Sequence, residues 1–275
     1  GYPTLRVGTL GAGPTLLLLH GFASGLEGWP RDQVRMLATR RRLVLVDLPG
    51  HGGSDPANQA DPVGGGAFAP DRVVSALVEV LERVTGRAEA DWLGYSMGGR
   101  IALHAARVGV PVRRLLLESA TPGLRSPEEQ TARRSRDAAW ADRFESEPIA
   151  SVLDDWLAQP IFRSRGDMPD AERLRQRALR LRCHGPSLSR ALRELGTGSF
   201  VPAWDLLHEW SDRTHLLVGA RDAKYVDIAR EIVETTSGVG VEVAAGAGHA
   251  PHMETPETWA RWVERSLGAD GLPEG

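Results

Sequence analysis

A serine between two glycines is the first candidate for chemistry in this 275-residue chain. Ser96 stands in the pentapeptide Gly94-Tyr95-Ser96-Met97-Gly98, which follows a short apolar run at 91–93 and precedes a helix-like run at 100–108. Small residues two before and two after the serine allow a sharp strand-to-helix reversal, which lifts the hydroxyl clear of the strand. The pattern predicts a reactive serine, although an ordinary Gly-rich turn without chemistry can have the same short pattern.

An acid and a base follow two later apolar runs. Asp222 comes shortly after the run 215–219, and His249 shortly after the run 241–244. A serine hydroxyl needs an imidazole to take its proton, and the imidazole needs a carboxylate to hold its tautomer and stabilise its cation. We therefore predict a catalytic triad of Ser96, Asp222 and His249, in the chain order of the α/β-hydrolases. The weaker rivals are His252 as base and Asp212 and Asp227 as acids.

A tight turn at His20-Gly21-Phe22 is expected to complete the site. It directly follows the apolar run 15–19, and Gly21 permits a turn that lets the backbone N–H of Phe22 face the serine. Together with the backbone N–H of Met97, this group is predicted to form an oxyanion hole. We interpret His20 as structural. His51 is a poor candidate for the base because it precedes the serine in the chain.

These residues need a sheet whose strands end on one side. Short apolar runs alternate with amphipathic, helix-length runs, and several apolar runs are continuous, as in strands covered on both faces. Strands are expected at 4–7, 15–19, 43–46, 91–93, 114–117, 215–218 and 241–244, and helices at 29–39, 71–84, 100–108, 226–235 and 256–267. The alternation predicts an α/β-hydrolase fold, a mostly parallel sheet flanked by helices, with ligands beyond the carboxyl ends of the strands.

The alternation fails between residues 122 and 200, where the chain is helical and rich in arginine. We predict that 122–200 forms an inserted helical cap over a core made of residues 1–121 and 201–275. Mixed arginine and acidic residues predict a solvated surface laced with salt bridges for most of this segment. The Gly-rich segment 57–70 is expected to be a mobile surface loop.

The composition is that of an ordinary globular protein, with 41% hydrophobic and 25% charged residues. A net charge of −3 gives no general field for nucleic acid. No run approaches the roughly 18 apolar residues of a membrane span, and no signal-peptide pattern is present, so we expect a cytoplasmic protein without a membrane partner. The single cysteine, Cys183, excludes an internal disulfide and lacks the motif of a thiol nucleophile.

Longer motifs resemble one family of this fold. In the core they are His20-Gly21-Phe22 with Trp29, the segments 47–52 and 94–100, and Ala247-Gly248-His249 with His252 and Glu254. In the cap and after it they are 121–124, 128–129, 132–133, Trp140, 143–144, 147–148, 155–156, 159–160, Phe162, 179–180 and 221–225. Through these motifs the chain is similar to the 2-succinyl-6-hydroxy-2,4-cyclohexadiene-1-carboxylate synthases of menaquinone biosynthesis.

The resemblance implies an elimination that uses no metal or organic cofactor. In that family the triad serine is the base beside the succinyl carbonyl of 2-succinyl-5-enolpyruvoyl-6-hydroxy-3-cyclohexene-1-carboxylate, and pyruvate is expelled. The substrate carries three carboxylates, and the resemblance implies that Arg100, Arg133 and Arg180 bind them, with Tyr95 and Trp156 lining the pocket. Guanidinium groups suit this task because they pair with carboxylates bidentately. We expect a monomer whose partner is a small polycarboxylate.

Two other functions stay open. One is a serine esterase or C–C bond hydrolase of a small acidic substrate, in which Ser96 attacks a carbonyl carbon or activates water. The other is a ligand-binding protein without catalysis, which a complete triad disfavours. Lys224 lies beside Asp222 near the expected mouth of the site, but we do not include it among the ligand-binding residues.

Overall fold

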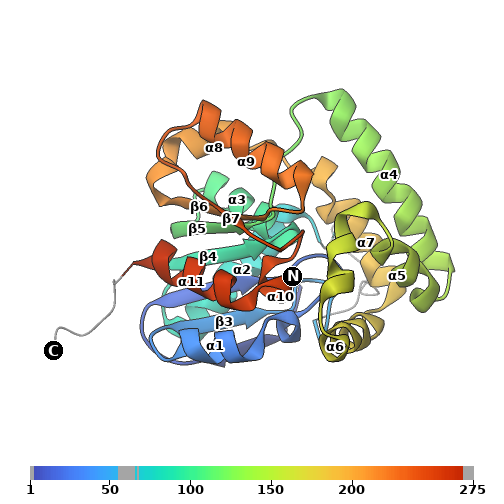
Figure 1. Cartoon of the computed structure of the whole chain (residues 1–275), viewed down its shortest axis with the longest axis horizontal. Coiled ribbons are helices and arrows are strands. Elements are labelled where there is room, and N and C mark those ends of the chain that lie inside the picture. The colour runs from blue at the N-terminus through green and yellow to red at the C-terminus, as the bar shows by residue number, and fades with distance from the viewer. Residues whose placement is uncertain (1–2, 55–65, 67, 269–275) are drawn as a thin grey trace.

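The computed structural model describes residues 3–54, 66 and 68–268, and its centre is a seven-stranded sheet in the order β1-β3-β2-β4-β5-β6-β7 (Figure 1). The strands are β1 (Val7–Leu10), β2 (Thr15–Leu19), β3 (Arg42–Val46), β4 (Ala90–Tyr95), β5 (Val112–Glu118), β6 (Thr214–Gly219) and β7 (Gly240–Ala244). β1 pairs antiparallel with β3, and every other pair in the sheet is parallel. The predicted α/β-hydrolase sheet is therefore confirmed.

Helices cover both faces because successive residues of a strand point to opposite sides. Leu17 and Leu19 of β2 pack in one cluster with α2 (Pro70–Thr85), α3 (Met97–Arg107) and α8 (Trp204–Glu209). Leu16 and Leu18 pack in a second cluster with α1 (Arg31–Ala38) and α11 (Pro256–Leu267). A strand buried on both faces has apolar residues at successive positions. The unbroken run of leucines in β2 therefore identifies this strand from the sequence.

A helical insertion separates β5 from β6 and lies beside one end of the sheet, to the right in Figure 1. It contains α4 (Pro127–Ser146), α5 (Ile149–Leu157), η2 (Pro160–Asp167), α6 (Asp170–Leu181) and α7 (Gly185–Leu195). A capping box starts α4, since the Ser126 side chain accepts from the Glu129 N–H and the Glu129 side chain accepts from the Ser126 N–H. The insertion has its own apolar cluster, centred on Phe144, Val152 and Leu188.

Cys183 belongs to that apolar cluster and is buried. Burial raises the pKa of its thiol. A cysteine of this kind holds its proton at neutral pH and is a poor nucleophile. None of the helices in the described part of the chain combines the length and the apolar character that crossing a bilayer requires.

Two expectations need correction. The first strand lies at Val7–Leu10 and not at 4–7, because it is an edge strand fixed by pairing with β3 and its half-exposed side chains carry no continuous apolar signal. Most of the expected loop at 57–70 lies outside the described residues. Its last part is not a surface loop, since Phe68 is 2% exposed and Pro70 begins α2.

Candidate active site

Ser96 lies at a strained reversal between β4 and α3. Its φ of 51° and ψ of −104° are unusual for a residue with a side chain, and such a backbone costs about 1–3 kcal/mol. The flanking glycines are sterically required, because a Cβ at Gly94 would lie 2.4 Å from the carbonyl oxygen of Gly98, and one at Gly98 would lie 2.1 Å from that of Leu19. The elbow is thus a feature of the backbone, and the close packing at Gly94 and Gly98 holds Ser96 in its strained conformation at the end of the sheet.

The structure brings Ser96, His249 and Asp222 together from three separate segments. His249 Nε2 is 3.1 Å from Ser96 Oγ, and His249 Nδ1 is 2.7 Å from Asp222 Oδ2. In the neutral tautomer that fits both contacts, Nδ1–H donates to the carboxylate and Nε2 accepts from the serine hydroxyl. Burial lowers the pKa of His249 and the Asp222 carboxylate opposes that shift. The imidazole is therefore neutral at pH 7 and free to take a proton.

The rival base His252 is engaged elsewhere. Its Nδ1 donates to Glu118 Oε1 over 2.7 Å, and its backbone N–H donates to the same oxygen over 2.9 Å. The rival acids pair with near neighbours, Asp212 with Arg213 and Asp227 with Arg230.

His20 and His51 have structural contacts. His20 Nε2 accepts from the backbone N–H of Leu48 over 2.9 Å, and its Nδ1 lies 2.7 Å from the carbonyl oxygen of Gly21. His51 is buried against His20 and Phe22, and burial lowers its pKa to about 3. Both histidines support the turn at Phe22.

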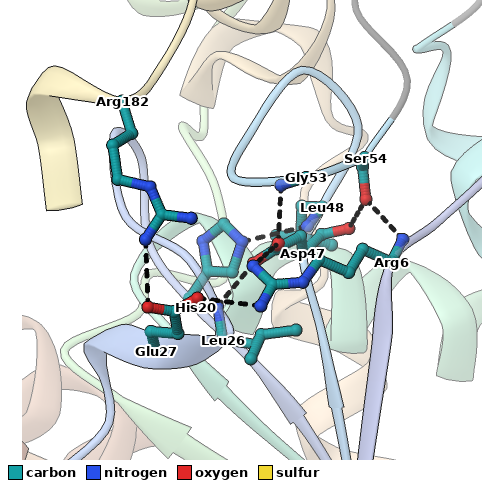
Figure 2. Close-up of polar contacts among 9 residues, drawn as sticks. All are labelled: Arg6, His20, Leu26, Glu27, Asp47, Leu48, Gly53, Ser54 and Arg182. Atoms are coloured by element: carbon teal, nitrogen blue, oxygen red, sulfur yellow. Dashed lines mark hydrogen bonds and ion pairs between the residues drawn. The ribbon is translucent and has the colours of Figure 1, made fainter.

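The segment that follows the expected oxyanion turn is bound by the buried carboxylate of Asp47 (Figure 2). Its oxygens accept from the backbone N–H of Leu26 over 2.6 Å and of Gly53 over 2.7 Å. Glu27, next to Leu26, pairs with Arg182 at the end of α6 over 3.1 Å. Asp47 therefore joins the segment after β2 to the turn after β3. Glu27 joins the segment after β2 to the helical insertion.

Ser96 and His249 open into a cavity of about 370 Å³ between the sheet and the helical insertion. All the other residues predicted to surround the ligand also line it: Phe22, Tyr95, Met97, Arg100, Arg133, Trp156 and Arg180. Asp222 lies behind His249, out of the lining. Met97 is the first residue of α3, so its N–H is one of the unpaired donors of a helix N-terminus.

The cavity is strongly cationic. Six basic side chains line it, and the described lining holds one carboxylate, that of Asp137; the cations are Arg100, Arg133, Arg136, Arg165, Arg180 and Lys224. Asp137 is already bound, since Arg133 Nε lies 2.9 Å and 3.0 Å from its two oxygens. A ligand with several negative charges would complement this surface.

Arg100 and Arg180 are the most buried of these cations, at 8% and 5% exposure. Arg100 donates to the carbonyl oxygen of Leu195 over 3.1 Å, and Arg180 makes a long contact of 3.4 Å to Gln176. Neither forms an ion pair with any described carboxylate. Burial lowers the pKa of Arg100 to about 10 and that of Arg180 to about 9.

Comparison with known proteins identifies the family. The model of the Alpha/beta hydrolase family matches residues 16–262. The chain belongs to the alpha/beta hydrolase family. Within it, the chain is 34% identical over 245 residues to the 2-succinyl-6-hydroxy-2,4-cyclohexadiene-1-carboxylate synthases of Salmonella agona (strain SL483) and Salmonella newport (strain SL254). The alignment covers 88% of this chain and 89% of each relative, and the predicted resemblance is confirmed.

Solved structures agree with this placement. MenH from S. aureus is similar with a TM-score of 0.84 at 25% identity, covering 96% of this chain and 99% of that chain. A thermophilic esterase from Thermogutta terrifontis has a TM-score of 0.79 at 24% identity, covering 96% and 92%. The esterase likeness concerns the alpha/beta hydrolase fold alone.

Several lining residues of this alpha/beta hydrolase were not predicted from the sequence. The cavity is also lined by Lys224, which is not among the predicted ligand-binding residues, and by Arg136, Trp140, Phe162, Arg165 and Tyr225. Lys224 lies in the first turn of α9, two residues after Asp222, and that spacing was the available signal. Arg136 and Arg165 carry no local signal, because other arginines of the insertion, such as Arg143 and Arg177, pair with acids on the surface.

Among the described residues, no group of histidine, cysteine and acidic side chains is arranged to hold a metal ion. Chemistry at this site can be carried by the side chains themselves. A serine hydroxyl that can lose its proton to His249 can act as a nucleophile or as a base, and the surrounding cations can stabilise or position negative charge.

Proposed function

We propose that this protein is a lyase of menaquinone biosynthesis that eliminates pyruvate from 2-succinyl-5-enolpyruvoyl-6-hydroxy-3-cyclohexene-1-carboxylate. The product would be 2-succinyl-6-hydroxy-2,4-cyclohexadiene-1-carboxylate, the compound after which its Salmonella relatives are named. The observation that carries the proposal is a hydrogen-bonded Ser96–His249 pair facing six cations and one carboxylate. A substrate with three carboxylates matches that charge.

The reaction begins with proton transfers through the triad. His249 Nε2 takes the proton of Ser96, and Ser96 Oγ takes a proton from the carbon beside the succinyl carbonyl. The carbonyl oxygen gains negative charge, which the backbone N–H groups of Phe22 and Met97 stabilise. Asp222 holds the His249 tautomer and stabilises the imidazolium.

The elimination then breaks the C–O bond of the enolpyruvyl ether. The electrons of the broken C–H bond form a double bond between C2 and C3 of the ring, and the existing C3–C4 double bond shifts to C4–C5. The ether oxygen at C5 leaves with the C–O electrons as the enolate of pyruvate. The proton now held by His249 returns to the leaving group, which becomes pyruvate. No oxidant, reductant or water is consumed, so the proposal requires no metal or organic cofactor.

Arginines would fix the pose that makes this proton transfer possible. Arg100 and Arg180 are buried and have no carboxylate partner among the described residues, and an unpaired buried charge is costly, so a ligand carboxylate would relieve that cost. Arg133 shares its charge with Asp137 and would bind more weakly. Tyr95 and Trp156 would form the walls.

A second candidate, hydrolysis of a small acidic ester, is favoured by the same Ser96–His249 contact, because a nucleophilic serine needs the same base. The two reactions differ in where the substrate lies relative to Ser96. In the elimination a C–H bond faces Oγ, and in hydrolysis a carbonyl carbon does.

The test is pyruvate release from the enolpyruvyl substrate, followed by coupled reduction, beside hydrolysis of p-nitrophenyl esters by the same preparation. We expect fast pyruvate release, feeble ester hydrolysis, and loss of pyruvate release in Ser96→Ala. Brisk ester turnover without pyruvate would reject the lyase and leave the esterase.

A further inference from the structure

Arg165 is a cation of the cavity that the resemblance did not assign. It lies in η2, its guanidinium carbon is 4.5 Å from the centre of the Phe162 ring, and its Nη2 donates to the hydroxyl of Tyr95 over 2.9 Å. It lines the same cavity as Ser96 and His249. The side chain is therefore fixed at the wall nearest to the residue that precedes the serine.

The charge of Arg165 is not matched by a carboxylate in the described part of the chain. Its Nε is buried and has no hydrogen-bond partner there. The nearest acid in sequence, Asp167, pairs with Arg221 instead. Within the described chain this guanidinium makes one hydrogen bond, to Tyr95, and no ion pair, so it retains charge and N–H donors for an anion that these residues do not supply.

Arg165 also sets the direction of the Tyr95 hydroxyl. A guanidinium has donors only, so the Tyr95 oxygen accepts, and its own proton is left to donate to another group. Burial raises the pKa of Tyr95, which keeps that proton in place at neutral pH. The pair thus offers two kinds of donor, a charged N–H and a neutral O–H.

Arg180 lies on the same side of the cavity. The charge of Arg165 is close enough to add to the burial that lowers the pKa of Arg180, and both arginines line the catalytic cavity as well as an adjoining one of about 570 Å³. Two like charges without carboxylate partners repel each other, and a carboxylate between them removes the repulsion.

We propose that Arg165, with the Tyr95 hydroxyl and Arg180, forms a carboxylate subsite and that Arg165 determines the preference of this protein for polycarboxylates. The inference rests on the proposed function only in naming the ligand as a polycarboxylate. It adds a substrate-binding residue that belongs to η2 of this chain.

The test is calorimetric binding of propane-1,2,3-tricarboxylate at fixed ionic strength. Arg165→Met keeps the length of the side chain and removes its charge, and Arg165→Lys keeps the charge and removes the planar fork. Arg163→Met is the matched control, because Arg163 is an exposed residue of the same segment that lines the adjoining cavity but not the catalytic one.

We expect Arg165→Met to raise the Kd for the tricarboxylate about tenfold to a hundredfold, the range for losing a charge-assisted hydrogen bond. Arg165→Lys should recover part of the loss, and Arg163→Met should stay within about twofold of the wild type. A Kd for Arg165→Met within twofold of the wild type, or no binding by the wild type, would overturn the inference.

A second measurement distinguishes whether Arg165 binds a carboxylate or only shapes the wall of the cavity. Arg165→Met should raise KM for a carboxylated substrate by a much larger factor than KM for p-nitrophenyl acetate, whereas equal factors for both would mean that Arg165 only shapes the wall. The pyruvate assay of the wild type is read independently. If the wild type releases no pyruvate but Arg165→Met loses carboxylate binding selectively, the lyase proposal fails and the subsite stands. If the wild type releases pyruvate and Arg165→Met shows no such loss, the lyase proposal stands and the subsite fails.

Discussion

Glu118 receives two hydrogen bonds from His252, one from the backbone N–H and one from Nδ1. Glu118 ends β5, and His252 lies in α10 (Pro251–Glu254), three residues after His249. The segment that carries the proposed base is thereby tied to the central part of the sheet. Because β5 neighbours β4, which leads to Ser96, the base and the serine share one rigid support.

Glu118→Ala should reduce the free energy of unfolding by about 3 kcal/mol, because it leaves the buried Nδ1–H of His252 without a partner. Turnover should fall as well, since His249 loses part of its support. Urea unfolding and the turnover number measure the two effects. Glu242→Ala is the control: it removes an exposed ion pair with Arg265 and should cost under about 1 kcal/mol. Equal losses in both variants would argue against the tie.

Ser96→Ala and His249→Ala should each reduce turnover by about 10⁴-fold or more while the protein stays folded. Triad members act as a unit, so the double variant should be little worse than either single one. Initial rates and circular dichroism provide the measurements. If Ser96→Ala keeps more than about a tenth of the activity, a loss of only about 1.4 kcal/mol, the serine is not the base.

Activity should rise with pH through the pKa of His249, because only the neutral imidazole can take the serine proton. Burial, the dominant effect, and the charge of Arg165 both lower this pKa, so the acid limb of kcat/KM should have its midpoint below 6.5. Arg165→Met removes one of the lowering influences and should move the midpoint upward. A midpoint above 6.5 in the wild type, or a downward move in the variant, would contradict the assignment.

Arg180→Met should stabilise the protein and reduce its activity. This buried guanidinium has no carboxylate partner in the part of the chain that the structure describes, so its removal should raise the free energy of unfolding by about 1–3 kcal/mol. The same change should cost about 2–5 kcal/mol in kcat/KM, because a ligand carboxylate then loses its partner. Arg177→Met is the control on the same helix, where an exposed pair with Asp154 predicts changes under about 1 kcal/mol. A less stable Arg180→Met would mean that this charge is already well satisfied without ligand.

The sheet could be predicted from the sequence where its strands are buried on both faces. The run 15–19 and the helix 256–267 match their observed bounds, because continuous burial and a clear apolar stripe leave one solution. The edge strand β1 has only one neighbour and half-exposed residues, so its position depends on a pairing that no local pattern encodes.

The candidate site could be predicted only in part. The glycines around Ser96 and the order of Ser96, Asp222 and His249 are local signals, and the structure brings these side chains within hydrogen-bonding distance. Arg165 has no such signal. Whether one of the many arginines between β5 and β6 faces the cavity or the solvent depends on how the helices of the insertion pack, which is a property of the whole fold.

The side chains of the cavity come from two different parts of the chain, and this division affects how the protein can change over evolution. All three proposed triad residues come from the core, whereas Arg133, Arg136, Arg165 and Arg180, four of the six lining cations, come from the helical insertion. The residues proposed to transfer protons and the cations proposed to select the ligand therefore lie on separate pieces of chain. If these proposals hold, substitutions confined to the insertion can change the ligand that the cavity accepts while Ser96 stays unaltered.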